Sequence, residues 1–105
     1  MSLRWPTKDP NETLDYSLDW SRFLYDGTNI ISVVWYIDVD GVRTIFPEST
    51  SQQNLSNLGT SNTTRIATIN LGGGNLNQDY KLTCVMTDST GSTAVKSVKI
   101  RIRYR

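Results

Sequence analysis

Few side chains in this sequence have the chemistry of a catalytic or metal-binding site. The chain contains no histidine, so it lacks the commonest general base and the commonest metal ligand, and no Ser-His-Asp or Cys-His arrangement can form. Its one cysteine, Cys84, alternates with Leu82 and Met86, which predicts an inert thiol on the apolar face of a strand. A single cysteine also excludes an internal disulfide. We therefore predict no enzymatic activity and no cofactor.

The acidic residues near position 40 faintly resemble a calcium loop. Asp38 and Asp40 precede Gly41, but an EF-hand requires a glutamate at its twelfth position, where this chain has Ser49. Asp-Gly between two apolar runs is instead a strong hairpin signal. The sequence predicts a turn here and no metal site.

A stripe of basic residues follows the last apolar run. Its members occupy every second position, and they are Lys99, Arg101, Arg103 and Arg105. Alternate residues of a strand share a face, so the four side chains would lie together. If the first and last strands are neighbours, Asp15 and Asp19 would face this stripe within the molecule. Internal pairing or solvation, an acidic protein partner and nucleic acid all stay open, although the net charge of +1 argues against nucleic acid.

The elements that must position these residues are short strands. Apolar side chains recur at every second position, the pattern of strands with one buried face, and no segment of helical length has a 3.6-residue apolar stripe. The segments with strand character are 14–20, 30–39, 42–46, 63–71, 80–86 and 98–104. Residues 48–62 are polar and predict a loop, with room for a short edge strand. About seven short strands separated by turns predict an all-β chain folded as a single antiparallel sandwich.

The chain divides into two regions in this interpretation. Residues 1–12 contain two prolines and no apolar alternation, which predicts an extended N-terminal arm, and residues 13–105 form the sandwich. Its predicted core consists of Trp35, Ile37, Tyr80, Leu82, Cys84, Ile100 and Ile102.

Size and composition fit one folded domain. A chain of 105 residues with 37% hydrophobic residues can bury a core without a metal or a disulfide. Its first residues lack the apolar stretch of a signal peptide, and no run approaches the ~20 apolar residues that span a membrane. We expect synthesis in a host cytoplasm and no membrane contact.

The segment from Asp79 to Ala94 reads DYKLTCVMTDSTGSTA. It resembles the last hairpin of bacterial immunoglobulin-like and polycystic-kidney-disease (PKD) repeats, and Ile31 to Trp35 resembles the strand that carries their core tryptophan. The resemblance implies an immunoglobulin-like sandwich in which Tyr80 forms a tyrosine corner, with its hydroxyl bound to loop backbone.

The segment from Thr7 to Trp20 reads TKDPNETLDYSLDW. It resembles the opening of small proteins encoded among the virion genes of tailed bacteriophages and prophages. The resemblance implies a non-enzymatic structural component of the virion, an accessory, cement or adaptor subunit of the head (capsid) or neck region. Its expected partners are other virion proteins, contacted in many symmetric copies, with no small-molecule substrate.

Two sets of residues are predicted to make these protein–protein contacts. Leu3 and Trp5 are isolated apolar side chains on the arm, which would cover a neighbouring subunit, and the basic stripe is the second candidate. The alternative is an adhesion or carbohydrate-binding immunoglobulin-like module, in which Trp5, Trp20 or Tyr36 forms a stacking platform.

Overall fold

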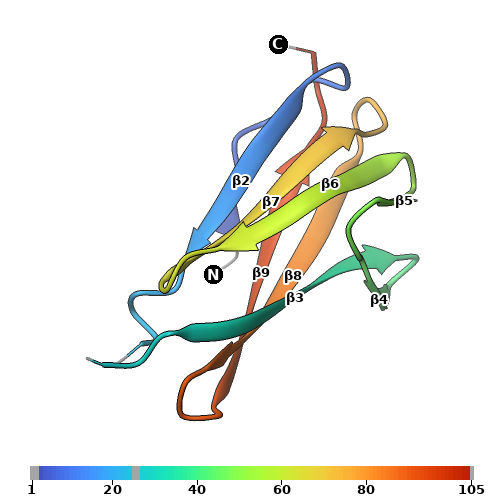
Figure 1. The fold of residues 1–105 in the computed structure, drawn as a ribbon. Coiled ribbons are helices and arrows are strands. Elements are labelled where there is room, and N and C mark those ends of the chain that lie inside the picture. The colour runs from blue at the N-terminus through green and yellow to red at the C-terminus, as the bar shows by residue number, and fades with distance from the viewer. Residues whose placement is uncertain (1–2, 25–26, 105) are drawn as a thin grey trace.

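The protein folds as two β-sheets packed face to face (Figure 1). The computed structural model describes residues 3–24 and 27–104. The strands in chain order are β1 (Leu3–Arg4), β2 (Thr13–Asp19), β3 (Ile30–Val39), β4 (Val42–Ile45), β5 (Thr50–Gln52), β6 (Leu55–Asn62), β7 (Ile66–Gly73), β8 (Asp79–Asp88) and β9 (Thr93–Arg101). No helix suited to crossing a membrane occurs in this described part of the chain.

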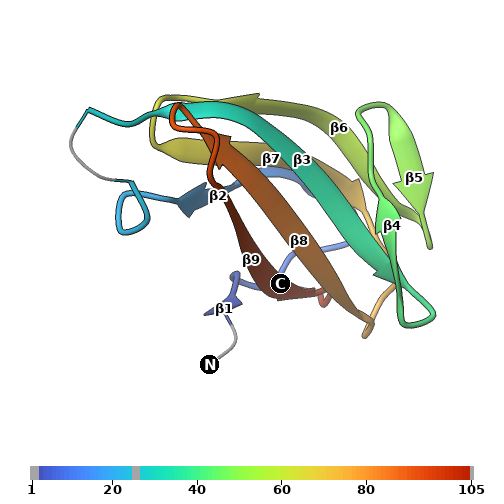
Figure 2. The same cartoon turned by 90° about the horizontal axis from the view of Figure 1, so that it is seen from below.

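The two sheets have the strand orders β1-β9-β8-β3-β4 and β2-β7-β6-β5. Figure 2 shows β3, β8 and β9 of the five-stranded sheet in front of β2, β6 and β7. All pairs are antiparallel except β1 and β9, which run parallel. This arrangement confirms the predicted immunoglobulin-like antiparallel sandwich. The described strands number nine rather than about seven, since the two-residue β1 and the three-residue β5 are too short to show an apolar period.

The predicted core is confirmed. Trp35, Ile37, Tyr80, Leu82, Cys84, Ile100 and Ile102 are all buried. Trp35 of β3 lies opposite the free Cys84 of β8 within the five-stranded sheet, and both side chains are buried in the core. The Tyr80 hydroxyl accepts a hydrogen bond from the Asn75 N–H (2.8 Å) and donates one to the Gln53 carbonyl (2.7 Å). These bonds form the expected tyrosine corner.

The polar segment 48–62 is more regular than the sequence suggests. It contains β5 and the eight-residue β6, which pairs along its length with β7. Only Leu55 and Leu58 are large and apolar in it, so hydropathy gives no strand signal. The buried Asn57 holds this strand in place, because its side-chain amide donates to the Phe46 carbonyl at 2.8 Å.

The N-terminal segment differs from the expected free arm. It is extended, but it lies along β9. The backbone N–H of Trp5 donates to the Lys99 carbonyl (2.9 Å), and the backbone N–H of Lys8 donates to the Arg101 carbonyl (3.0 Å). The Trp5 ring is only 9% exposed and stacks on Tyr16 with centroids 4.9 Å apart. Residues 3–12 therefore complete this sandwich instead of projecting from it, and the interior position of Trp5 corrects its assignment to a neighbouring subunit.

Lys8 anchors the same segment from within. Its side chain is fully buried, and its ammonium donates to the backbone carbonyls of Gly73 (2.6 Å) and Asp9 (2.9 Å). Burial lowers the pKa of Lys8, while the nearby carboxylates of Glu12 and Asp9 act in the opposite direction. Gly73 is required at this contact, since its φ is +69° and a Cβ would lie 2.6 Å from the Asn54 carbonyl oxygen.

Candidate interaction surface

The solvent-facing side of the five-stranded sheet brings together side chains from every one of its strands. In β3, Trp35 and Ile37 point into the core, so Val34, Tyr36 and Asp38 point outward. Residues that lie opposite one another on neighbouring strands point to the same side of a sheet. The outward side chains of β3 therefore form rows with those of β4, β8 and β9. We call this surface the outer face.

One half of the outer face is apolar. Val34 of β3 lies opposite Val85 of β8, and Val85 lies opposite Val95 of β9. In the next row Tyr36 lies opposite Ile45 of β4. Val34, Ile45 and Val95 are 38%, 55% and 53% exposed. These five residues form the apolar half, whose grouped exposed side chains are typical of a protein contact site.

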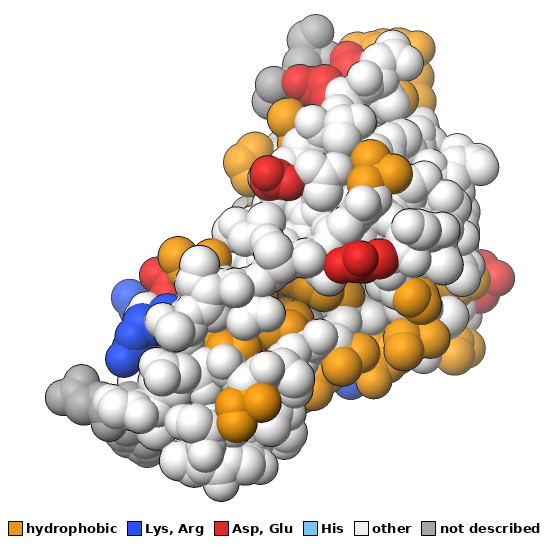
Figure 3. Space-filling model, viewed as in Figure 1, with side chains coloured by type: hydrophobic (Ala, Val, Ile, Leu, Met, Phe, Trp, Pro, Cys, Tyr) orange, Lys and Arg blue, Asp and Glu red, His pale blue; other side chains and the backbone are white. Residues whose placement is uncertain are grey.

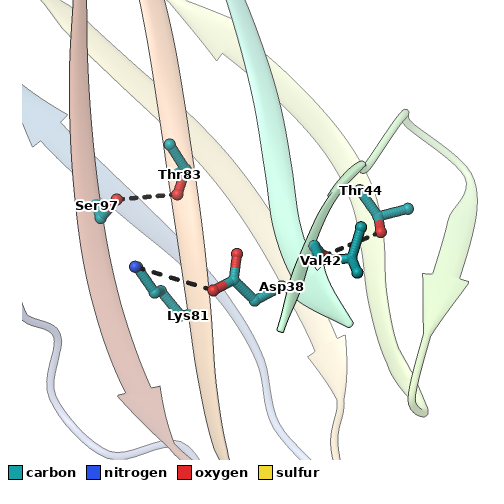
Figure 4. Close-up of polar contacts among 6 residues, drawn as sticks. All are labelled: Asp38, Val42, Thr44, Lys81, Thr83 and Ser97. Atoms are coloured by element: carbon teal, nitrogen blue, oxygen red, sulfur yellow. Dashed lines mark hydrogen bonds and ion pairs between the residues drawn. The ribbon is translucent and has the colours of Figure 1, made fainter. Parts of the chain in front are cut away.

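Hydroxyl groups lie at the centre of the outer face. Thr83 of β8 and Ser97 of β9 are opposite one another, and their side-chain oxygens are 2.9 Å apart in a hydrogen bond (Figure 4). Thr83 is fully buried by its neighbours, so this pair is a fixed part of the surface.

The other half of the outer face is basic. Arg4 of β1 is paired in register with Lys99 of β9, and Lys99 lies opposite Lys81 of β8. Next in the row is Asp38, whose carboxylate is 3.9 Å from the Lys81 ammonium (Figure 4). Arg43 of β4, opposite Asp38, ends the row.

A fifth cation, Arg101, lies one row further on and pairs with Asp79 at 3.2 Å. The basic half thus consists of Arg4, Arg43, Lys81, Lys99 and Arg101. Both ion pairs are exposed, and such pairs contribute at most about 1 kcal/mol to stability. Five cations against two carboxylates leave an excess of positive charge.

The structure places two residues of the predicted basic stripe on the outer face. Lys99 and Arg101 lie on the outer face, whereas Arg103 is exposed beyond the end of β9 and Arg105 lies outside the described residues. Leu3 lies opposite Val98 in β1. The sequence did not single out Arg4, Arg43 and Lys81, because their place beside Lys99 depends on which strands pair.

Pairing of the stripe with Asp15 and Asp19 within the molecule, one of the alternatives left open by the sequence, is excluded by the strand order. Both acids belong to β2, which pairs with β7 in the other sheet. Asp15 accepts a hydrogen bond from the Asn70 side chain (2.6 Å). Asp19 accepts one from the Ser21 N–H (2.9 Å), and hydrogen bonds from Ser21 lower the pKa of Asp19. Figure 3 shows this side of the molecule, on which acidic side chains are scattered among uncharged polar ones and basic side chains gather mainly at one margin.

The structure also places the residues of the other sites considered from the sequence, which are a sugar-stacking platform, a reactive thiol and a metal site. Trp20 is fully buried and Trp5 nearly so, which leaves only the half-buried Tyr36 from the expected sugar-stacking platform. Burial raises the pKa of the Cys84 thiol to about 12, so the nucleophilic thiolate is disfavoured. Among the described residues, no group of three or more acidic, cysteine or histidine side chains is placed to hold a metal ion.

Comparison with known proteins identifies the family. The family model of the podophage GP4 fiber-tail adaptor protein gp77 matches residues 8–101, from the buried Lys8 to the last residue of β9. None of the curated proteins matches the chain. The family match confirms the resemblance to virion proteins of tailed phages. It spans nearly the whole sandwich, and the chain therefore belongs to the gp77 family of podophage fiber-tail adaptor proteins, a family of phage structural proteins.

Proposed function

We propose that this chain is a non-enzymatic adaptor that joins a fibre to the tail of a podophage particle by protein–protein contacts. The family match supports this role and favours the junction of fibre and tail over the head or neck expected from the sequence. Because fibres are distributed around a tail, the proposal includes several copies of the chain in each particle.

The observation that carries the proposal is the difference between the two sides of the sandwich. The outer face combines apolar and basic side chains, whereas the side formed by β2 and β7 presents Asp15, Asp19 and uncharged residues such as Asn70. An adaptor must bind two unlike partners at once. A rigid sandwich with two unlike sides meets that requirement without a moving part.

The test is to disrupt the gene in the phage that encodes this chain and to purify the resulting particles. We expect mass spectrometry to find the chain in parental particles. Electron microscopy of the mutant should show heads and tails without fibres, and the gene supplied in trans should restore them. Mutant particles that keep their full set of fibres, or parental particles that lack the chain, would contradict the proposal.

A further inference from the structure

Three cations stand side by side on the outer face although the chain is almost neutral. Arg4, Lys99 and Lys81 occupy neighbouring strands in one row, while the net charge of the chain is +1. Like charges directly opposite one another on paired strands destabilise a sheet. In the isolated subunit, the Lys81–Asp38 ion pair at the end of the row is exposed and offsets little of this repulsion. Such a local conflict with stability is expected where a surface serves a function.

The apolar half lies directly beside this row. Val34, Val85 and Val95 cross three strands without a break, and the row of Tyr36, Thr83 and Ser97 separates them from the cations. Interfaces between proteins typically have an apolar centre with aromatic residues and arginine, bordered by charged groups. The outer face has the same constituents, an apolar half with Tyr36 beside a basic half that contains arginine, and its cations call for a partner that supplies carboxylates.

We infer that the outer face binds an acidic surface of another virion protein, an inference that rests on the proposed adaptor function. The partner's carboxylates lie over the row of Arg4, Lys99 and Lys81, and its apolar side chains cover Val34, Val85 and Val95. Positive charge from the row steers the partner during assembly, and contact with the valines holds it.

Other occupants match the surface less well. A strand of nucleic acid would meet the carboxylates of Asp38 and Asp79 among the cations. Binders of single strands carry several aromatic side chains among their basic residues, whereas Tyr36 is the one aromatic side chain among the described residues of this face. The side of the sandwich formed by β2 and β7 would offer a second copy's basic half Asp15 and Asp19, and Asp15 already accepts a hydrogen bond from Asn70.

The substitution Lys99→Glu tests binding without weakening the fold. The new carboxylate would lie between Lys81 and Arg4, which converts two repulsive pairs into attractive ones, so the melting temperature should stay equal or rise. Binding to an acidic partner should instead fall. Arg103→Glu is the matched control, because it makes the same change of charge at an exposed position beyond β9.

Binding is measured with particles purified from the phage whose gene for this chain is disrupted. Purified protein is added, the particles are sedimented, and the bound chain is quantified over a range of NaCl concentrations. We expect Lys99→Glu to bind at least tenfold less than the parent at low salt, with a smaller difference at high salt, and Arg103→Glu to bind like the parent.

A second pair of variants tests the apolar half. Val95→Ser should weaken sedimentation with particles at every salt concentration, since apolar contact is not screened by ions. Val42→Ser is the control, because this valine is 64% exposed but lies on the other side of β4. It should bind like the parent.

The outcomes distinguish the inference from the function on which it rests. If the parent does not sediment with particles, the proposed function fails and the inference with it. If the parent binds, and Lys99→Glu binds equally well and also restores fibres to the particles as fully as the parent does, the inference alone is overturned. It is also overturned if Lys99→Glu abolishes self-association seen by analytical ultracentrifugation, or a gel shift of DNA, while binding to particles persists.

Discussion

Trp5 is an interior residue although it is only the fifth residue of the sequence. Its ring stacks on Tyr16 and lies 6.1 Å from Trp35 between centroids, and its indole N–H donates to the Ser17 carbonyl at 3.2 Å. Trp5→Ala should lower the free energy of unfolding by about 3 kcal/mol, because it removes a large buried ring and leaves a cavity. Urea denaturation followed by circular dichroism measures the loss. Trp5→Phe should lose less, and a Trp5→Ala variant as stable as the parent would place the ring outside the core.

Cys84 is expected to be unreactive in the folded protein. It is fully buried and burial raises its pKa to about 12, so a thiol reagent at neutral pH meets neither an accessible sulfur nor a thiolate. Labelling should be slow in the native state and fast in denaturant. Equal rates in the two states would show that the sulfur is accessible.

The same pKa shift predicts a dependence of stability on alkaline pH. A thiol whose folded pKa is raised binds its proton more tightly in the folded state, so stability is fully present below pH 9 and declines as pH rises from 9 toward 12. The decline should be shallower in Cys84→Ala than in the parent.

At the scale of elements, the segment 3–12 behaves as part of the five-stranded sheet. Deleting residues 1–12 would remove Trp5 and Lys8 and leave the Gly73 carbonyl without its ammonium partner. The truncated protein should be destabilised more than Trp5→Ala, or fail to fold, as measured by thermal unfolding. A truncated protein that melts within a few degrees of the parent would show that the segment is dispensable.

The turn between β8 and β9 depends on one carboxylate. Oδ1 of Asp88 accepts hydrogen bonds from the Thr90 hydroxyl (2.6 Å), the Thr90 N–H (2.9 Å) and the Ser92 N–H (3.1 Å). The Thr90 side chain and these backbone groups lower the pKa of Asp88.

A lowered carboxyl pKa gives stability that is present above the unfolded value of about 3.9 and lost as pH falls below it. The acid side of the stability profile should therefore be shallower in Asp88→Asn than in the parent. Stability profiles of equal steepness would show that the Asp88 carboxylate has no such role.

Apolar alternation in the sequence predicted the strands that have one buried and one exposed face. Tyr80, Leu82 and Cys84 alternate with polar residues in β8, and that period alone identified their buried face. The burial of Lys8 could not be predicted in this way, because its acceptor on Gly73 is 65 residues away in sequence. The same limit left the pairing of Asp15 and Asp19 open, since apolar alternation in β2 does not reveal that its partner is β7.

At the scale of the whole molecule, fold and interaction surface were not equally predictable. Alternation placed Lys99 and Arg101 on one side of the last strand, which was correct. The regular strand ends at Arg101, and Arg103 follows it with its backbone N–H bound to the Lys8 carbonyl (2.8 Å). The outer face became recognisable only when strand order set Lys81 and Arg4 beside Lys99. Because this surface is made of rows that cross five strands, the pattern of one strand reveals only that strand's part of it.

The two unlike sides of the sandwich lead to the last prediction, which concerns both contacts of an adaptor. Lys99→Glu changes the outer face, and Asp15→Lys changes the side formed by β2 and β7. Both positions are exposed, so neither substitution should reduce stability by more than about 0.5 kcal/mol. If each side binds a different partner, both variants should reduce the number of fibres per particle.

Only one of the two variants should also reduce the amount of this chain in the particle. The subunit whose contact with the tail is broken is lost, whereas the subunit whose contact with the fibre is broken stays behind without a fibre. Mass spectrometry of particles made with each variant gives the first quantity, and counts of fibres in electron micrographs give the second. Equal loss of chain and fibre in both variants, or normal particles with Asp15→Lys, would mean that the subunit does not use its two sides separately.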